Sequence, residues 1–157
     1  MTEINFYHLQ KTPLEKSLPR LLEKAYAASK RAVVLVDTEE RIKDLDAQLW
    51  TYSPQSFLPH GSARDGFEKN HPIWLTTTLE NPNQASVLVV IDGEEISDFT
   101  SFEKCLDLFN GYDEEAVDRA RKRWQRYRQE GHVLTYWFQD DKGSWHKKDD
   151  GRQTVSN

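Results

Sequence analysis

The sequence contains almost no cysteine and no long hydrophobic run. Its one cysteine, Cys105, excludes a disulfide within the chain and is typical of a protein from a reducing compartment. No apolar segment approaches the roughly 20 residues that a helix needs to cross a bilayer, and the N-terminus has no charged segment followed by an apolar one. These absences predict a soluble cytoplasmic protein, and 157 residues are enough for one domain with a single core.

The usual signatures of nucleotide, metal and hydrolytic sites are missing as well. Residues 61–66 have the glycine spacing of a P-loop, but Phe67 and Glu68 follow where phosphate and magnesium require Lys and then Ser or Thr. There is neither a Gly-x-Gly-x-x-Gly motif nor a Gly-x-Ser-x-Gly nucleophile elbow. The histidines show no i, i+4 pair, and Cys105 lies in an apolar run that favours burial. We therefore expect no enzymatic activity, no cofactor and no metal.

Apolar runs alternate with helical periodicities along the chain. Strands are predicted at residues 4–9, 32–36, 73–75, 87–91 and 133–138, and helices at 13–31, 39–52 and 113–130. Thr12, Pro13 and Glu15 predict a capping box with Thr12 as the N-cap of the first helix. The apolar segment 102–109 is compatible with a strand or with two helical turns. Strands that are apolar on both faces, separated by helices, predict an α/β fold with a mostly parallel sheet and helices on both of its faces.

Positive charge is concentrated in residues 119–128, which contain six Lys and Arg side chains and no acid. The whole chain has a net charge of −5, so the remaining residues hold 15 basic against 26 acidic side chains. A cationic patch on an acidic body favours a short acidic ligand. The patch also contains two aromatic residues, Trp124 and Tyr127.

A helix over this segment separates two stripes of residues. Val117, Arg121, Trp124 and Arg128 share one stripe, and Ala116, Ala120 and Tyr127 share the neighbouring one, which we expect to face the core. Arg121 and Arg128 lie two turns apart, about 10 Å along the axis, with Trp124 between them. This spacing suits a peptide that carries a carboxylate and an aromatic ring.

Two other interpretations remain open at this point. Most runs of charge are simply a solvated helix face, and a basic helix with aromatic residues at 113–130 is also typical of a nucleic-acid-binding module. The acidic remainder of the chain opposes the second interpretation, because a phosphate backbone would be repelled everywhere outside this helix.

Four motifs resemble the chi subunit of bacterial DNA polymerase III holoenzyme. They are Asn5-Phe6-Tyr7, Leu45-Asp46-Ala47-Gln48-Leu49-Trp50, Ser56-Phe57-Leu58-Pro59-His60, and the basic segment from Ala120 to Arg128. The resemblance covers residues 4–138 in order. It implies a single Rossmann-like domain at 1–138 without a phosphate loop. The residues after it, 139–157, are polar, and we expect them to form a partly disordered extension.

The resemblance further implies a non-catalytic replisome adaptor. Members of this family join the psi subunit and, through it, the clamp-loader complex. They also bind the acidic C-terminal tail of single-stranded-DNA-binding protein, which ends in an aromatic residue with a free carboxylate. Carried over by position, Trp50 and Phe57 would form apolar walls of the tail pocket, Arg121 the carboxylate clamp and Trp124 the aromatic floor, where a tyrosine is familiar in the family.

The sequence departs from the family pattern at two positions of this helix. Val117 and Gln125 stand where relatives can carry lysine, so the additional positive charge is expected from Arg128 or Lys122. No residues can be assigned to the psi-binding surface, although an exposed apolar patch away from the basic helix is expected.

Overall fold

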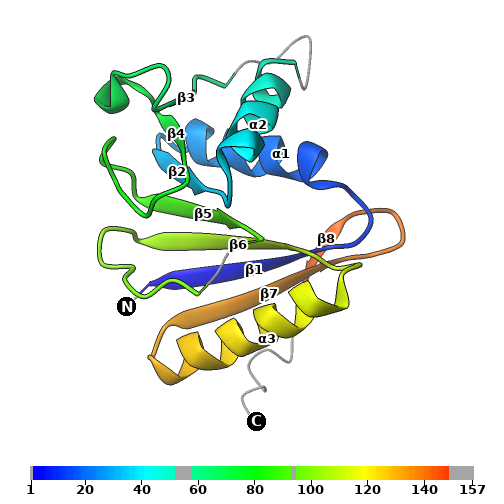
Figure 1. Ribbon diagram of the computed structural model, residues 1–157. Coiled ribbons are helices and arrows are strands. Elements are labelled where there is room, and N and C mark those ends of the chain that lie inside the picture. Colours follow the sequence, from blue (N-terminus) through cyan, green and yellow to red (C-terminus); the bar gives the residue numbers. More distant parts are fainter. Residues whose placement is uncertain (1, 52–57, 93–94, 149–157) are drawn as a thin grey trace.

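The computed structural model describes residues 2–51, 58–92 and 95–148 and contains one eight-stranded sheet flanked by helices (Figure 1). The strands are β1 (Glu3–Leu9), β2 (Ala32–Leu35), β3 (Gly61–Ser62), β4 (Ile73–Thr76), β5 (Val87–Ile91), β6 (Lys104–Asn110), β7 (Val133–Gln139) and β8 (Trp145–Lys147). The helices are α1 (Leu14–Ala27), α2 (Glu39–Thr51) and α3 (Glu114–Gln129), with a short 3-10 helix, η1, at Glu68–Asn70.

The sheet is parallel except at one edge. Its strand order is β3-β4-β2-β5-β6-β1-β7-β8, and only the last pair, β7 with β8, is antiparallel. Strand β1 lies between β6 and β7, with Phe6 opposite Asp107 on one side and Tyr136 on the other. The prediction of a Rossmann-like, mostly parallel α/β fold is therefore confirmed.

Helices cover both faces of the sheet, as the sequence predicts. Helices α1 and α2 pack on one face and α3 on the other (Figure 1). Neighbouring residues of a central strand therefore enter different cores, because successive side chains of a strand point to opposite faces. Val34 belongs to the same core cluster as Leu45 of α2, whereas Val33 belongs to the cluster that includes Ala120 and Tyr127 of α3. This alternation explains why the central strands β2 and β5 are apolar at every position.

One local prediction, the start of the first helix, needs revision. The first helix begins at Leu14 with Pro13 as its N-cap and no side-chain capping bond, so the predicted Thr12 cap is wrong. Thr12 instead faces Gln139, whose amide group bonds to its hydroxyl. Pro19 lies inside α1 without ending it.

The ambiguous segment 102–109 forms strand β6 from Lys104 onward. It is a strand because β1 and β5 hydrogen-bond to its two sides, and this long-range pairing decides what local periodicity leaves open.

The residues that follow Phe138 differ from the expectation of a loose polar extension. Strand β7 continues to Gln139, and a turn then leads into β8, which pairs Trp145 with Gln139. Gly143 has a φ of +84°, which glycine adopts readily in such a turn. Trp145 packs edge-on against Tyr7, with ring centroids 5.2 Å apart. The indole of Trp145 packs against the core and anchors the hairpin. Residues 149–157 lie outside the described part of the chain.

Candidate binding site on helix α3

Helix α3 begins and ends where the sequence predicts. The Asp113 carboxylate accepts hydrogen bonds from the backbone N–H groups of Glu115 (3.0 Å) and Ala116 (3.4 Å), which caps the first turn. At the other end Gly131 has a φ of +88°, the left-handed conformation typical of a residue just past a helix C-terminus. One regular helix therefore presents the whole basic segment.

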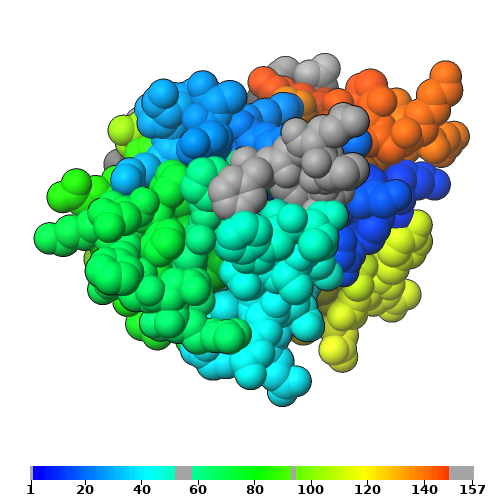
Figure 2. All heavy atoms as spheres, turned by 90° about the horizontal axis from the view of Figure 1, so that it is seen from above, coloured from blue at the N-terminus to red at the C-terminus, as the bar shows by residue number. Residues whose placement is uncertain are grey.

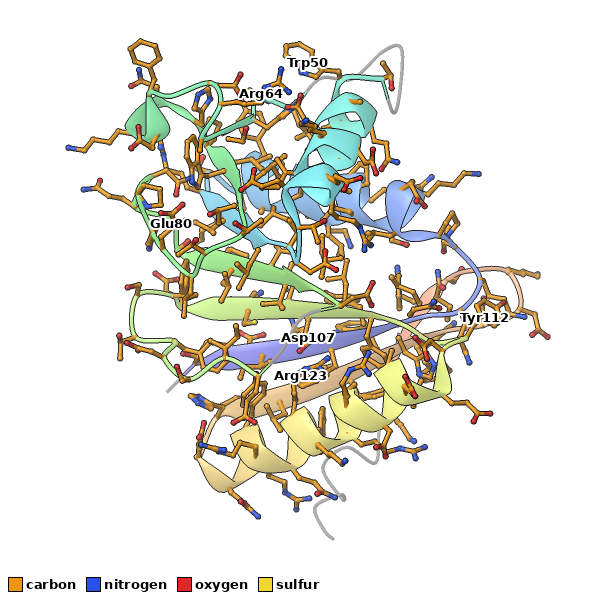
Figure 3. All side chains as sticks on the ribbon, viewed as in Figure 1. Trp50, Arg64, Glu80, Asp107, Tyr112 and Arg123 are labelled. Atoms are coloured by element: carbon orange, nitrogen blue, oxygen red, sulfur yellow. The ribbon has the colours of Figure 1, made fainter. Side chains whose placement is uncertain are left out.

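The inner face of α3 consists of Ala116, Ala120, Arg123 and Tyr127, all buried against the sheet. Three of these were predicted to face the core, but Arg123 was counted among the surface cations. Its guanidinium forms a two-pronged ion pair with Asp107 of β6, with Nε–Oδ2 and Nη2–Oδ1 distances of 2.9 Å each (Figure 3). Burial raises the pKa of Asp107, and the hydrogen bond and charge of Arg123 oppose that rise. One of the six cations thus belongs to the core.

Three further cations of the segment have acidic partners at the surface. The pairs and their shortest N–O distances are Arg119 with Glu115 (4.0 Å), Lys122 with Asp118 (3.3 Å), and Arg126 with Glu95 (2.7 Å) and Glu130 (2.8 Å). Each of these cations has its charge partly offset by a neighbouring acid. Lys122, one of the two residues expected to supply extra positive charge to a ligand, is among them.

The outer face of α3 consists of Val117, Arg121, Trp124 and Arg128. Arg121 and Arg128 are exposed, and within the described residues neither has an acidic partner within 4.0 Å. Trp124 is half-buried, and its ring centroid lies 5.3 Å from that of Phe6 and 5.9 Å from that of Tyr136. The structure therefore places two unopposed guanidinium groups on either side of a supported, partly accessible indole.

Two side chains from neighbouring strands lie beside this outer face. Tyr136 of β7 packs on Trp124, and its hydroxyl is hydrogen-bonded to Nδ1 of His8 on β1. Burial raises the pKa of Tyr136 to about 12, and the charge of Arg121 acts against that rise. Burial also lowers the pKa of half-buried His8, and the charges of Arg121 and Lys148 lower it further. Arg121 thus acts electrostatically on both rings.

Of the two remaining predicted site residues, the structure describes only Trp50, and it lies apart from this group. Trp50 lies on α2, across the sheet from α3, and is 56% exposed (Figure 3). In the view of Figure 2, α2 occupies the near face and only part of α3 is seen at the margin. The Trp50 ring is 5.3 Å from the ring of His60, whose Nε2 lies 2.9 Å from the Asp46 carboxylate. Phe57 lies outside the described residues, so its place in a pocket stays a prediction.

The loop after β1 occupies the position that holds a phosphate in nucleotide-binding α/β folds. Its backbone N–H groups at Gln10, Lys11 and Thr12 converge on a single acceptor at 3.2, 2.8 and 3.2 Å. That acceptor is the side-chain carbonyl oxygen of Gln139, which is 4% exposed. The donors that could cradle an anion are thus already used by the protein itself.

A cavity of about 410 Å³ opens beside this loop at the carboxyl ends of the strands. Its charged lining includes Arg41 and Asp92, whose Nη2 and Oδ2 atoms are 3.4 Å apart. Asp92 also accepts a hydrogen bond from the backbone N–H of Asn110 at 3.1 Å. Within the described residues no cluster of His, Cys, Asp and Glu is arranged to hold a metal, and no helix is long and apolar enough to cross a membrane.

Residues 1–135 match the family model described as DNA polymerase III chi subunit, HolC. The chain belongs to the DNA polymerase III chi subunit family. A chi relative from Rickettsia prowazekii, named as a probable DNA polymerase III subunit chi, is 35% identical over 109 residues, covering 69% of this chain and 66% of the relative. The chi subunit of Escherichia coli is 24% identical over 122 residues, covering 77% and 82%. That of Pseudomonas aeruginosa is 25% identical over 138 residues, covering 85% and 94%.

Sequence reasoning predicted the helical residues of this candidate site and missed the strand residues that lie beside them. Tyr136 and His8 come from strands β7 and β1, and their meeting depends on the parallel register between those strands. Lys148 comes directly after strand β8. The turn before that strand, Asp140-Asp141-Lys142-Gly143, has a composition typical of a hairpin turn, and this signal could have predicted the hairpin. Arg123 carried no local signal, because a buried arginine and a surface arginine are identical in sequence.

Proposed function

We propose that this chi-family chain is a non-catalytic replisome adaptor that binds the acidic C-terminal tail of single-stranded-DNA-binding protein. The observation that carries the proposal is the pair Arg121 and Arg128, unopposed by acids in the described residues, on either side of the half-buried Trp124. The relatives support it, since each is named as a subunit of DNA polymerase III.

Each residue of the outer face has a distinct part in this proposal. Arg121 grips the terminal carboxylate in a two-pronged hydrogen bond, for which a guanidinium has the right geometry. The indole of Trp124 packs on the terminal aromatic ring, and Phe6 and Tyr136 hold that indole from behind. Arg128 attracts an acidic side chain further along the tail. The acidic remainder of the chain repels the same tail elsewhere, which directs it to this face.

A pair of synthetic peptides tests the carboxylate clamp. Both carry the same acidic sequence and end in phenylalanine, one with a free carboxylate and one with an amide. We expect the amidated peptide to bind at least about tenfold more weakly in calorimetry, because hydrogen bonds to charged groups contribute about 1.5–3 kcal/mol. Equal affinities for the two peptides would contradict the role of Arg121 as a carboxylate clamp.

Two charge-reversing variants of the same helix test the position of the site. Arg121→Glu should abolish peptide binding, whereas Lys122→Glu should reduce it only slightly, although both change the net charge equally. Lys122 is the matched control because it lies one residue further along α3 and already pairs with Asp118. Equal losses in the two variants would mean that the tail responds to overall charge and not to this site.

The ion pairs that most α3 cations form with neighbouring acids disfavour direct nucleic-acid binding by this helix. With two unopposed arginines in the described part of the helix, a single strand could release only one or two counterions. We expect an oligonucleotide titrated at low salt to bind weakly and with a shallow salt dependence. A steep salt slope, together with unchanged peptide affinity in Arg121→Glu, would favour the nucleic-acid module instead.

We assign the psi subunit, and through it the clamp-loader complex, to a surface away from α3. An adaptor in the cytoplasmic replisome needs two separated surfaces to hold two partners, and Trp50 is an exposed aromatic residue on the far side of the sheet. Trp50→Ala should therefore weaken co-purification with psi and leave the affinity for the tail peptide unchanged. If the peptide affinity falls instead, Trp50 belongs to the tail site.

A further inference from the structure

The β7–β8 hairpin ends in two consecutive lysines that project toward opposite faces of the sheet. Lys147 Nζ lies 6.0 Å from the ring centroid of Trp137, which packs against the core on the α1 side. Lys148 Nζ lies 5.7 Å from the ring centroid of Tyr136, which packs against the core on the α3 side. Only Lys148 is therefore directed to the same side as the outer face of α3.

Lys148 and Arg121 act on the same pair of rings. Tyr136 contacts both the ammonium of Lys148 and the indole of Trp124, at 5.7 and 5.9 Å. The charges of Arg121 and Lys148 both lower the pKa of His8, to which the Tyr136 hydroxyl is hydrogen-bonded. The two cations thus flank one aromatic surface, although they are 27 positions apart in the chain.

The hairpin holds Lys148 in this place, away from the acids among the described residues. The backbone N–H of Lys148 donates to the carbonyl oxygen of Tyr136 at 2.8 Å. The acids of the nearby turn have other partners, Asp140 with His146 at 2.7 Å and Asp141 with Lys11 at 3.9 Å. Among the described residues no acid lies within 4.0 Å of Lys148.

We propose that Lys148 is a further specificity-determining residue of the tail site, which receives an acidic side chain of the bound peptide while Arg121 holds the terminal carboxylate. This inference rests on the proposed function. Because Lys122 is offset by Asp118, Arg128 on the helix and Lys148 on the hairpin are the cations that can assist Arg121. Lys148 lies beyond residues 1–135, to which the family model is matched.

The test compares Lys148→Gln with Lys147→Gln, which remove the same charge on opposite faces of the sheet. Affinity is measured by calorimetry for the acidic free-carboxylate peptide and for a second peptide with its acidic side chains replaced by amides. We expect Lys148→Gln to weaken the acidic peptide about two- to fivefold, the size of one exposed charge pair. Lys147→Gln should leave its affinity unchanged, and neither variant should affect the amide-substituted peptide.

Three outcomes would overturn the inference, and one of them also overturns the proposed function. If Lys148→Gln binds like Lys147→Gln while Arg121→Glu abolishes binding, the tail site exists without Lys148. If Lys148→Gln weakens both peptides equally, the residue acts on the fold of the hairpin and not on a carboxylate. If Arg121→Glu leaves the affinity unchanged, the tail site itself is wrong and the inference falls with it. Circular dichroism of each variant checks that the fold is retained.

Discussion

The inner and outer faces of α3 use the same residue type in opposite ways. On the inner face Arg123 is 5% exposed and both of its bonds to Asp107 are 2.9 Å long. On the outer face Arg121, two residues earlier, is exposed and within the described residues has no acidic partner within 4.0 Å. A helix turns by 100° per residue, so two positions are enough to move a side chain from solvent to core.

The difference shows that a run of like charges is not one surface. Of the six cations in residues 119–128, one completes the core, three are offset by neighbouring acids and two remain for a ligand in the part of the chain that the structure describes. A cationic surface of two guanidinium groups suits the end of one acidic peptide better than the many phosphates of a nucleic acid. The class of partner that fits therefore depends on how many cations have no acidic neighbour, and not on the total number of cations in the segment.

The largest effect should follow from breaking the inner ion pair. Arg123→Ala leaves the Asp107 carboxylate buried without its partner, which typically costs about 3–5 kcal/mol of unfolding free energy. Urea denaturation would measure the loss, with the surface variant Arg119→Ala as control. A loss below about 0.5 kcal/mol, the scale of a surface substitution, would mean that the two faces do not differ.

A smaller loss is expected at the other polar group of the inner face. The Tyr127 hydroxyl accepts a hydrogen bond from the buried backbone N–H of Ile96 at 2.8 Å. Tyr127→Phe leaves that N–H without an acceptor and should lower the unfolding free energy by about 1–3 kcal/mol. Amide hydrogen exchange at Ile96 would show whether the loss is local, and unchanged protection there would contradict this account.

A pH dependence should arise beneath the outer face, at His8. Its pKa in the folded chain is lowered from 6.5 by burial, so the unfolded chain binds a proton that the folded chain does not. Stability should then be complete above about pH 6.5 and decline as the pH falls below that value. Urea denaturation between about pH 8 and pH 5 measures this slope, which His8→Gln should flatten. A slope that is the same in the variant would remove His8 as its source.

The smallest effect on stability belongs to the outer face itself. Arg121→Ala should change the unfolding free energy by no more than about 0.5 kcal/mol, because the side chain is exposed and has no acidic partner in the described residues. The same variant should nevertheless lose most of its affinity for the tail peptide, measured by calorimetry. A large loss of stability would show that Arg121 supports the fold, and the contrast with Arg123 would disappear.

Much of the fold could be predicted because local signals and tertiary packing agree. The apolar strands predicted at 32–36 and 87–91 and the helix after Asp113 are all present, and the first strand ends one residue early, at Leu35. Segment 104–110 could not be decided locally, since its strand identity depends on pairing with β1 and β5. The Thr12 cap failed because the loop before α1 bonds to Gln139, far away in the chain.

The candidate site was predictable only along the helix. The stripe of Arg121, Trp124 and Arg128 follows from helical periodicity, and the structure keeps these three residues on one face of α3. Trp50 was assigned to the same pocket by resemblance, yet the structure places it across the sheet from α3. Position in the sequence does not reveal which face of a sheet a helix covers, because that depends on the direction of each crossover.

The sequence by itself determined most of the helices and central strands of this protein, its family and the existence of one basic helix with an indole among its cations. These follow from spacing and residue type, which are local properties of the chain. Only the tertiary structure decided which arginine is buried against Asp107, which cations acids offset, and that Lys148 reaches the same tyrosine as the outer face of α3. Those outcomes depend on the free energy of burying charge and on strand register, and both are set by residues distant in the sequence.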